Sequence, residues 1–524
     1  KSSCRQFDSV PGHSVMKDVN KKELLKKALT HHKNGEIDAA DKIYITILES
    51  DSFNFDANHL HALVLSQKKN YIKAIEFFSK AYSQGPATCE LLNNFAIAYR
   101  NLKAYRECEK LLLEALTLDK KFINTYKNLS NCFLSQKKYD DALEVLETAY
   151  CLDKDSTKII CKIIEILFTK IGNKNNSEYI KKYEKYAEEL AKNHHHTNKA
   201  LSGLCYLHLD NIETSSKLFK EAELLVSGTL PSINTLKSLK DKKILLTMIK
   251  HEYEQISHID SDADGIRNVK ITQKFYDSLK KIYYKNDINF SDQEYEFISS
   301  LHKIRYNKAP KSRLNYLNKK HDTKLHEKIY KESNPQIVII DDFLDESYLY
   351  DLRKFFRCAN IFKYPYPAGY IGAFLGKGLA NKSVLELSKE LKETFPSIFD
   401  MLSLSQAWAY KYDSQQKGIS IHADDAKVNV NFWITDDSAN LNKQTGGMIV
   451  WGKEPSLDTK FSEFNSLSSI PKMEEEVKNT NPIKIPYKSN RAVIFNSKLY
   501  HATDDIDFKD DYINRRINVT FLYK

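Results

Sequence analysis

The sequence predicts a multidomain protein in which an all-α helical-repeat solenoid precedes a double-sheeted β domain with flanking helices. Three observations predict this fold class: apolar columns that recur at a fixed spacing, a helical middle without that spacing, and alternating patterns from Gln336 onward. The 524 residues exceed one ordinary domain. We expect a disordered tail over 1–20, repeats over 21–225, a helical linker region over 226–335 and the β domain over 336–524.

Composition and charge limit the partners that the sequence predicts. The net charge is +10, but lysines are interleaved with Glu and Asp, which is typical of solvated helix faces rather than a nucleic-acid-binding stripe. Eight Cys without a C-x-x-C pair indicate reduced thiols in a cytoplasmic protein. No apolar run approaches the ~18 residues of a membrane span, and no secretory signal is visible. Residues 1–15 are expected to be unstructured, with Met16 as a candidate start.

The N-terminal half repeats every 34 residues. Four consecutive units keep small or large apolar residues in phase in five columns: Ile37, Tyr71, Tyr105 and Tyr139; Ala40, Ala74, Cys108 and Ala142; Tyr44, Phe78, Leu112 and Leu146; Ile47, Ala81, Ala115 and Ala149; and Ala28, Ala62, Ala96 and Ser130. The small residues allow two helices of a hairpin to approach closely, and the large ones fill the space between hairpins. No unit buries its apolar face alone, so the units are expected to stack.

These columns resemble the tetratricopeptide repeat. A degenerate copy follows at Gly203, Tyr206, Ile212, Ser215, Phe219 and Ala222 with the same internal offsets. The resemblance implies a concave groove for a protein or peptide partner. The alternative is a scaffold whose helices only pack against one another.

The middle region carries two patterns that imitate metal sites. Asp260, Asp262, Asp264 and Gly265 resemble the first half of an EF-hand loop, but the twelfth position is Ile271 instead of a bidentate Glu, which favours an acidic turn. Residues 194–196 are three consecutive His, whose side chains do not converge easily, so a solvated run is favoured.

Short alternating segments fill the C-terminal third. Residues 337–340 are typical of a buried strand and are followed by a helix from about Glu346. Further strands are predicted over 406–412, 418–423, 427–435, 447–451, 482–487, 491–496 and 514–523. Many short strands after a helix favour a jelly roll of the cupin-like, double-stranded β-helix kind.

One triplet in this region has the spacing of a metal site. His422 and Asp424 lie two residues apart, so on an extended chain both side chains face the same way. His501, which follows a later strand, is the candidate for a second imidazole. Two His and one carboxylate on one face leave coordination positions open, as in non-haem Fe(II) oxygenases. The sequence therefore predicts a metal site at His422, Asp424 and His501.

The last strand adds a basic pair. Arg515 and Arg516 point to opposite faces of a strand, so only one of them can enter the domain interior. An Arg buried there requires a carboxylate partner, which a guanidinium grips with two hydrogen bonds. Strand geometry alone leaves open which of the two is the inward residue, and the resemblance described next favours Arg516.

With these elements the region from Gln336 to the end resembles the 2-oxoglutarate/Fe(II) dioxygenase superfamily. His422-Ala423-Asp424 is similar to its H-x-D motif, His501 to its distal His and Arg516 to the Arg that binds the distal carboxylate of 2-oxoglutarate. The resemblance further implies co-substrate contacts by Tyr410, Tyr412 and Asn518, and Gly446-Gly447 is similar to the pair that opens a core strand. For Tyr412 a core role held by one hydrogen bond remains the alternative.

Some residues near the triad have two interpretations. Asp425, Asn429, Asn431 and Trp433 are candidates for the pocket lining near the metal, with core packing favoured for Trp433. The last strand, Arg516-x-Asn518-x-Thr520-Phe521, is especially similar to that of AlkB-type nucleic-acid demethylases, but Leu522 stands where those enzymes carry a second Arg.

The resemblance implies an enzyme that uses Fe(II), 2-oxoglutarate and O2, with ascorbate as an auxiliary reductant, to hydroxylate a substrate C–H bond. The leading hypothesis is a substrate protein or peptide presented by the repeats. The alternatives are a metabolite, lipid or sugar hydroxylase with repeats for assembly, a non-catalytic repeat adaptor, and a nucleic-acid demethylase. The last is not expected, because a basic patch is absent from the sequence. The sequence leaves the oligomeric state open.

Overall fold

The structure is a computed structural model that describes residues 12–172, 177–260, 271–416, 418–456, 459 and 461–524. Its contacts divide the chain into two compact units, Lys1–Lys170 and Ile171–Lys524.

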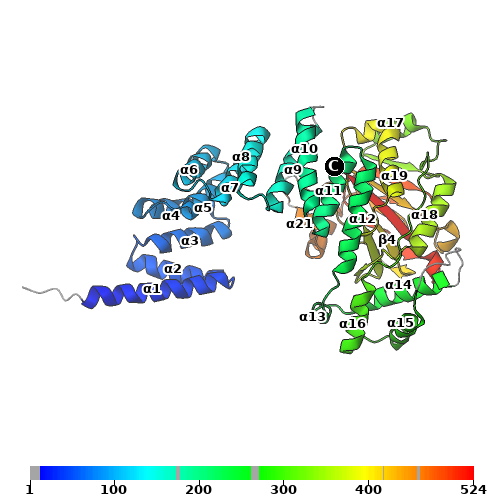
Figure 1. Ribbon diagram of the computed structural model, residues 1–524, viewed down its shortest axis with the longest axis horizontal. Helices are drawn as coiled ribbons and strands as arrows, with labels where there is room; N and C mark the ends of the chain where they lie inside the picture. Colours follow the sequence, from blue (N-terminus) through cyan, green and yellow to red (C-terminus); the bar gives the residue numbers. More distant parts are fainter. Residues whose placement is uncertain (1–11, 173–176, 261–270, 417, 457–458, 460) are drawn as a thin grey trace, which may run out of the picture. The chain divides into compact units, whose positions relative to one another are not determined.

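The first unit consists of successive helical hairpins (Figure 1). Its helices are α1 (Gly12–Lys33), α2 (Ile37–Ser50), α3 (Phe55–Gln67), α4 (Tyr71–Gln84), α5 (Cys89–Asn101), α6 (Tyr105–Leu118), α7 (Ile123–Ser135), α8 (Tyr139–Leu152) and most of α9 (Thr157–Ile171). Residues 1–11 of the expected tail lie outside the described residues, whereas 12–20 are helical. Neither proline nor glycine interrupts 13–33, which favours a continuous helix.

The predicted columns form the interior of this unit. Ala40, Ala74, Cys108 and Ala142 are all buried, as are the aromatic and aliphatic residues of the next column. The turn within each hairpin also repeats: Gly35, Lys69, Lys103 and Lys137 all adopt the left-handed conformation, with φ between 61° and 79°. A residue with positive φ after a helix ends it and reverses the chain. The helical-repeat solenoid is therefore encoded by both the apolar columns and the turns.

The second unit begins with helices that flank a β region. They are α10 (Ser177–Lys192), α11 (His196–His208), α12 (Ile212–Gly228), α13 (Ile233–Lys237), α14 (Lys243–Asp260), α15 (Gln273–Lys285), α16 (Asp292–Leu301) and α17 (Thr323–Glu332). The degenerate repeat forms the α11–α12 hairpin, where Gly203 leaves room for the ring of Phe219. By its contacts this hairpin belongs to the C-terminal unit, because it packs on the sheet that follows.

The β region is built from antiparallel strands in three sheets. The largest has the order β1-β9-β6-β12-β4-β3-β2, and the smaller ones are β10-β7-β8 and β11-β5. The strands are β1 (Ile337–Ile340), β2 (Tyr364–Tyr366), β3 (Tyr370–Phe374), β4 (Leu404–Tyr412), β5 (Gln415–Gln416), β6 (Val428–Trp433), β7 (Met448–Val450), β8 (Ile483–Ile485), β9 (Ala492–Asn496), β10 (His501–Thr503), β11 (Ile506–Asp507) and β12 (Ile517–Tyr523).

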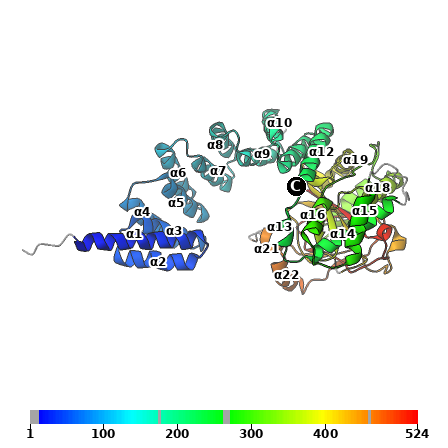
Figure 2. The same cartoon turned by 60° about the horizontal axis from the view of Figure 1, so that its bottom comes forward.

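The large sheet presents different chemistry on its two faces. On β6 and β12, Val430, Phe432, Val519 and Phe521 pack into the larger hydrophobic core together with the flanking helices. Among those helices are α18 (Glu346–Cys358), α19 (Lys382–Thr394) and α20 (Pro396–Phe399), while α14, α15 and α16 lie together in Figure 2. The intervening residues of each strand face the other side, because side chains alternate along a strand. That second face carries the candidate site.

The structure differs from the predicted strands in one place that matters for the site. Residues 418–423 do not form a strand: Gly418 has a φ of +68°, and only a single bridge joins His422 to His501. The short strands β2 and β3 and the helices α19, α20, α21 (Phe461–Phe464) and α22 (Ile470–Val477) were not predicted.

Candidate metal centre and adjoining pocket

His422 and His501 are held side by side by their main chains. The N–H of His422 donates to the carbonyl of His501 at 3.0 Å, and the N–H of His501 donates back at 2.9 Å. The two ring centroids are consequently 4.3 Å apart. The residue at 424 is fixed in the same way, since its N–H donates to the carbonyl of Ser497 at 3.0 Å. Three separate backbone hydrogen bonds thus bring the predicted ligands together from two distant segments.

The donor atoms of the triad converge. His422, Asp424 and His501 form the one cluster of three potential ligands found among the described residues, with ligand atoms all within 4.8 Å of one another. The Nε2 of His501 lies 3.5 Å from Oδ2 of Asp424. Each Nδ1 donates to a carbonyl two residues earlier, of Ser420 at 2.8 Å and of Leu499 at 2.9 Å. These bonds fix the tautomer and leave both Nε2 atoms free to bind a metal.

Burial sets the protonation of the triad for metal binding. Asp424 and His501 are each 6% exposed. Burial lowers the pKa of His422 to about 4, assisted by the neighbouring imidazole. Burial alone would raise the pKa of Asp424, but the hydrogen bond and charge of His501 and the charge of His422 hold it below its ordinary value. At neutral pH the site therefore presents a neutral His422 and a carboxylate, which are the forms that bind a cation.

A buried amide orients the carboxylate. Asn429 donates its Nδ2 to Oδ2 of Asp424 at 3.0 Å. Because the carboxylate can only accept, this bond also fixes the amide orientation, with Oδ1 pointing away from Asp424. That oxygen is buried and has no hydrogen-bond partner among the described residues.

Arg516 points into the same cavity and is only 2% exposed. Its Nε donates to the carbonyl of Gly446 at 2.6 Å, Nη2 to the carbonyl of Gly447 at 3.3 Å, and Nη1 to Oδ1 of Asn518 at 3.2 Å. Three of the five N–H groups are thereby satisfied. No carboxylate within the described parts of the chain forms an ion pair with this guanidinium, and burial lowers its pKa.

Arg515 supplies the contrast on the opposite face of β12. Its Nη2 lies 3.0 Å from Oδ1 of Asp413 and also pairs with Glu254 of α14. Two neighbouring residues immediately before β12 thus carry buried guanidinium groups, one neutralised by protein carboxylates and one not. A buried cation without a counter-ion is costly. The site around Arg516 therefore fits an external carboxylate, and the triad fits a divalent metal.

The two glycines before β7 shape the floor of this pocket. Gly446 has a φ of +82°, and a Cβ on Gly447 would lie 1.9 Å from the carbonyl oxygen of Ile485. Only glycine allows this close approach of the backbone, which places two carbonyl groups against Arg516.

The three residues predicted to contact the co-substrate, Tyr412, Asn518 and Tyr410, lie in different surroundings. The ring of Tyr412 lies 4.9 Å from the Arg516 guanidinium carbon, and its buried hydroxyl lacks a hydrogen-bond partner among the described residues. Burial raises its pKa, so it stays protonated. Asn518 accepts from Arg516 and donates to Thr520 at 3.3 Å. Tyr410 lines the cavity within a group of aromatic rings.

The cavity that joins these groups has a volume of about 520 Å³. Asn429 and Asn431 line it as anticipated. Asp425 does not, because it is exposed and pairs with Lys524 at 2.7 Å. Trp433 lies in the core beside Tyr487, which agrees with the packing interpretation. The lining also contains residues that the sequence analysis missed, chiefly the aromatic side chains Tyr366, Tyr370, Phe374 and Trp408.

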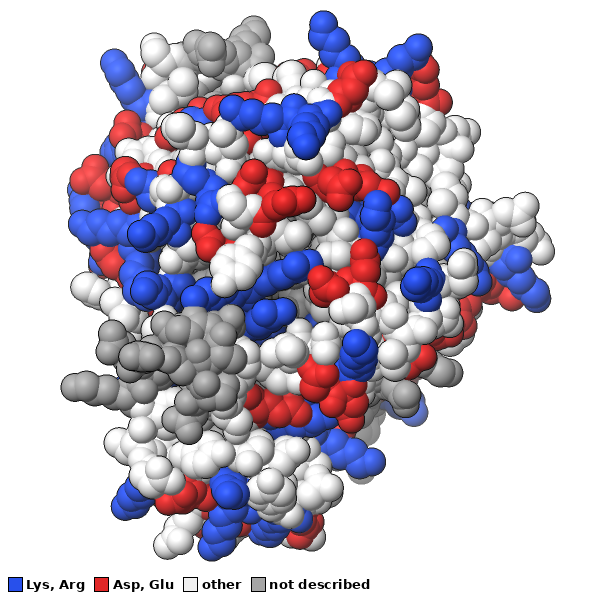
Figure 3. All heavy atoms as spheres, turned by 90° about the vertical axis from the view of Figure 1, so that its right-hand side faces the viewer, with Lys and Arg blue, Asp and Glu red and all other residues white. Residues whose placement is uncertain are grey.

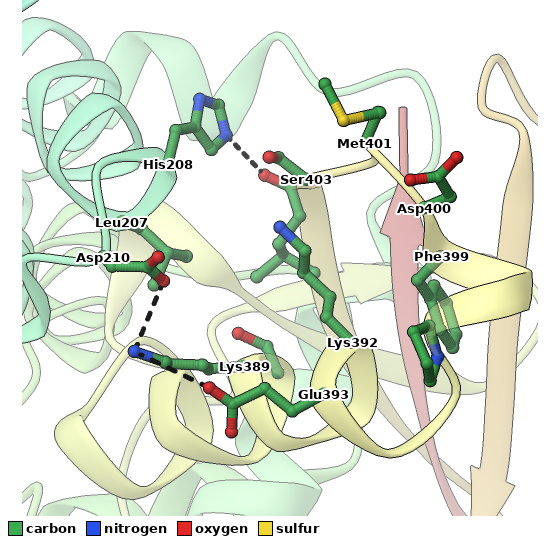
Figure 4. Close-up of a pocket in the computed structure, with 13 residues that line it drawn as sticks. Leu207, His208, Asp210, Lys389, Lys392, Glu393, Phe399, Asp400, Met401 and Ser403 are labelled. Atoms are coloured by element: carbon green, nitrogen blue, oxygen red, sulfur yellow. Dashed lines mark hydrogen bonds and ion pairs between the residues drawn. The ribbon is translucent and has the colours of Figure 1, made fainter. Parts of the chain in front are cut away.

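A second cavity of about 270 Å³ lies between the α11–α12 hairpin and α19, α20 and β4 (Figure 4). Lys389 in its wall contacts Asp210 at 3.4 Å and Glu393 at 3.8 Å, and His208 donates from Nε2 to the carbonyl of Leu404 at 2.9 Å. These contacts tie the hairpin to the sheet. The cavity carries no cluster of metal ligands among the described residues.

The other candidate ligand patterns do not form sites. Residues 261–270 of the EF-hand-like segment lie outside the described residues. His195 caps helix α11, and the three consecutive His are not part of a described ligand cluster. On the face drawn in Figure 3, basic and acidic side chains are intermingled, as the sequence predicts. Within the described parts of the chain, none of the helices combines the length and apolarity needed to cross a membrane.

Comparisons with known proteins concern the repeats. Residues 55–86 match the tetratricopeptide repeat family, which confirms the predicted repeat type. The chain is similar to the solved structure of pilF from Pseudomonas aeruginosa (20% identity over 40% of this chain and 94% of that chain, TM-score 0.33). It is also similar to the solved structure of a tetratricopeptide repeat protein from Parabacteroides merdae (15% identity over 40% of this chain and 79% of that chain, TM-score 0.30). At these TM-scores the likenesses add nothing to the argument. No curated protein matches the chain.

Proposed function

We propose that the C-terminal β region is a double-stranded β-helix that binds Fe(II) and 2-oxoglutarate and hydroxylates a C–H bond of a protein or peptide. The observation that carries the proposal is the meeting of two unlike features in one cavity. A triad of two His and one carboxylate leaves coordination positions open. A buried guanidinium without a protein counter-ion faces the same space. A dicarboxylate that also ligates the metal satisfies both.

Each residue of the site has a defined part in this function. His422 and His501 hold the metal through Nε2, and Asp424 holds it through a carboxylate that Asn429 keeps from rotating. The two remaining N–H groups of Arg516 bind the distal carboxylate of 2-oxoglutarate. The unpartnered hydroxyl of Tyr412, beside that guanidinium, donates to the same carboxylate.

When bound, the metal and co-substrate couple the oxidation of 2-oxoglutarate to succinate and carbon dioxide with the insertion of one oxygen atom of O2 into a substrate C–H bond. The chain provides the surroundings for this reaction. Asp424, His501 and Arg516 are almost fully buried and His422 is half-buried, which limits the access of water to the reacting centre. The main-chain bonds at His422, Asp424 and His501 hold the ligands in place before the metal arrives.

Anaerobic titration of the full chain with Fe(II) and then 2-oxoglutarate tests the proposal. The weak visible charge-transfer band of the chelate should appear with the wild type and be lost in His422→Ala. His194→Ala, which removes an exposed imidazole outside the cavity, is the matched control and should keep the band. If the wild type gives no band, the oxygenase proposal is wrong, and a non-catalytic repeat adaptor becomes the better account.

The proposed substrate class follows from the repeats. Tetratricopeptide repeats are solenoids, whose extended surfaces suit polypeptide binding. Incubating the enzyme with peptide libraries, O2, 2-oxoglutarate and ascorbate should yield products about 16 mass units heavier. Oxidation of small metabolites in place of every peptide would contradict this assignment.

A further inference from the structure

The cavity carries almost no charge beyond the groups that the proposed function already uses. Among the described residues that line it, Asp424 and Arg516 are the only Asp, Glu, Lys or Arg side chains, and both already belong to the proposed site. A phosphate, carboxylate or ammonium group of a substrate would lose its hydration there without gaining an opposite charge. The lining therefore selects an uncharged reacting group, and it disfavours phosphate-bearing nucleic acid.

The strand register shows which lining residues lie near Arg516 and which lie at the opposite end of the cavity. On β4, Tyr410 pairs with Asn518 of β12 and Trp408 pairs with Thr520, which is four residues after Arg516. This separation corresponds to about 13 Å along the strand. On the neighbouring strand Phe374 pairs with Trp408, which places both aromatic residues at the same end. The end away from Arg516 is thus aromatic and is left free for a second substrate.

The aromatic residues at this end form a continuous surface. We define the aromatic wall as Phe374, Trp408 and Tyr410. The centroid of the Tyr410 ring lies 6.2 Å from that of Phe374, at an interplanar angle of 85°, and 6.3 Å from that of Trp408. The first pair is packed edge to face and the second is tilted at 48°, so the three rings contact one another side by side instead of facing across an open cage of the kind that binds a methylated ammonium. The aromatic wall instead suits the flat or aliphatic surface of an uncharged side chain.

Two amide oxygens complement this apolar surface. The Oδ1 atoms of Asn429 and Asn431 both lack a hydrogen-bond partner among the described residues, and both side chains line the cavity. Asn429 is 1% exposed, and its orientation is set by its bond to Asp424. A buried acceptor without a donor is unfavourable unless a ligand supplies one. Main-chain N–H groups of an extended polypeptide are donors of this kind.

Building on the proposed function, we infer that the reacting residue is an uncharged, apolar residue within a polypeptide. Its side chain lies against the aromatic wall, and the peptide N–H groups of its segment donate to Asn429 and Asn431. A neutral glycan also stacks on aromatic rings, through the C–H face of its sugar ring, and is therefore included among the probes below. The repeats further favour a polypeptide.

The inference is tested with the full chain, Fe(II), 2-oxoglutarate and three kinds of probe. These are peptide libraries with one fixed central residue, a single-stranded oligonucleotide and a neutral oligosaccharide. Libraries with central Pro, Leu or Phe should be oxygenated at least tenfold more than those with Asp, Lys or phosphoserine. Preferential oxygenation of the charged libraries, the oligonucleotide or the oligosaccharide would overturn the inference. So would succinate formation without oxygenation of any neutral library, although the proposed function would survive. Absence of succinate throughout would refute the proposed function and the inference with it.

Variants locate the binding surface. Trp408→Ala should lower the ratio of oxygenated peptide to succinate about tenfold, because one large apolar contact is lost. The matched control is Tyr350→Ala, which removes an aromatic ring that is 62% exposed on α18 and outside the cavity. Gln406→Glu, at an exposed lining position of β4, should raise the yield from the Lys library relative to the Leu library. An unchanged ratio in Trp408→Ala would show that the aromatic wall does not bind the substrate.

Discussion

Replacing Arg516 by methionine should separate co-substrate binding from stability. In the protein alone, the substitution removes a buried cation without a counter-ion, which is favourable, and leaves three carbonyl or amide acceptors without a donor. The lost hydrogen bonds cost about 1 kcal/mol each, and relief of the desolvation is of similar size. We therefore expect the free energy of unfolding to change by less than about 2 kcal/mol.

Binding of 2-oxoglutarate should respond much more strongly. The variant loses two charge-assisted hydrogen bonds to the distal carboxylate, each worth about 1.5 kcal/mol or more. The total of about 3 kcal/mol corresponds to a rise in Kd of about two orders of magnitude. Anaerobic calorimetric titration of the Fe(II)-loaded protein with 2-oxoglutarate measures this Kd, and titration with Fe(II) alone should be unaffected because Arg516 is not a ligand.

Arg515→Met is the matched control on the neighbouring position. It removes the guanidinium from two half-buried carboxylates, Glu254 and Asp413, which keep only Lys250 as a cation at 4.0 and 3.5 Å, and the loss should cost about 1.5–3 kcal/mol. Arg515→Met should thus lower the melting temperature, while the folded protein keeps its Kd for 2-oxoglutarate. An unchanged Kd in Arg516→Met, or a larger Kd effect in Arg515→Met, would refute the assignment of the co-substrate end.

Three further predictions follow from single contacts. Asn429→Ala should weaken Fe(II) binding by about 10- to 100-fold, because Asp424 loses the amide that orients it; unchanged affinity in a metal titration would contradict this role. Gly447→Ala should destabilise the protein by several kcal/mol, because the added Cβ would lie 1.9 Å from the carbonyl oxygen of Ile485. Gly228→Ala, where the added Cβ would have nothing within 4 Å, is the control and should leave the stability unchanged. Thermal denaturation of the two variants measures the difference, and equal melting temperatures would contradict the prediction. Burial lowers the pKa of His208 to about 4. Its neutral form is favoured in the folded state, so the free energy of unfolding should fall as the pH drops from about 6.5 towards 4, by at most about 1.4 kcal/mol per pH unit. Urea denaturation across this range should show a smaller pH dependence for His208→Gln, and equal slopes would contradict the prediction.

The sequence predicted the structure correctly where a regular spacing of residues indicated it. The 34-residue columns define the repeats because the same small and large residues must meet in each hairpin. The period of two in a strand predicts that Arg515 and Arg516 face opposite ways, and the structure places them so. The same period predicts that His422 and Asp424 face one direction, although their segment is held by a turn and one bridge instead of a strand.

Other parts of the site carry no such signal. The aromatic wall depends on Phe374 in β3, a short strand preceded by Pro365 and Pro367, whose proline-rich surroundings disfavour a strand in the sequence. Lys363 and Lys411 are buried, although the lysine-rich composition indicates solvated side chains. Nothing in their immediate neighbours distinguishes them, because their partners Glu252 and His251 are more than 100 residues away.

Helix α14 makes the middle of the chain inseparable from the β region. Glu252 of this helix forms an ion pair with Lys363. Glu254 forms one with Arg515, the residue next to Arg516. A recombinant fragment starting at Gln336 would keep every residue of the proposed metal and co-substrate site. It would lose Glu252, the carboxylate partner of Lys363, and Glu254, one of the two carboxylate partners of Arg515. Such a fragment is expected to aggregate or to recover poorly. An expression boundary near residue 171, where the chain divides into its two compact units, preserves these ion pairs and is the natural starting point for preparing the C-terminal unit on its own.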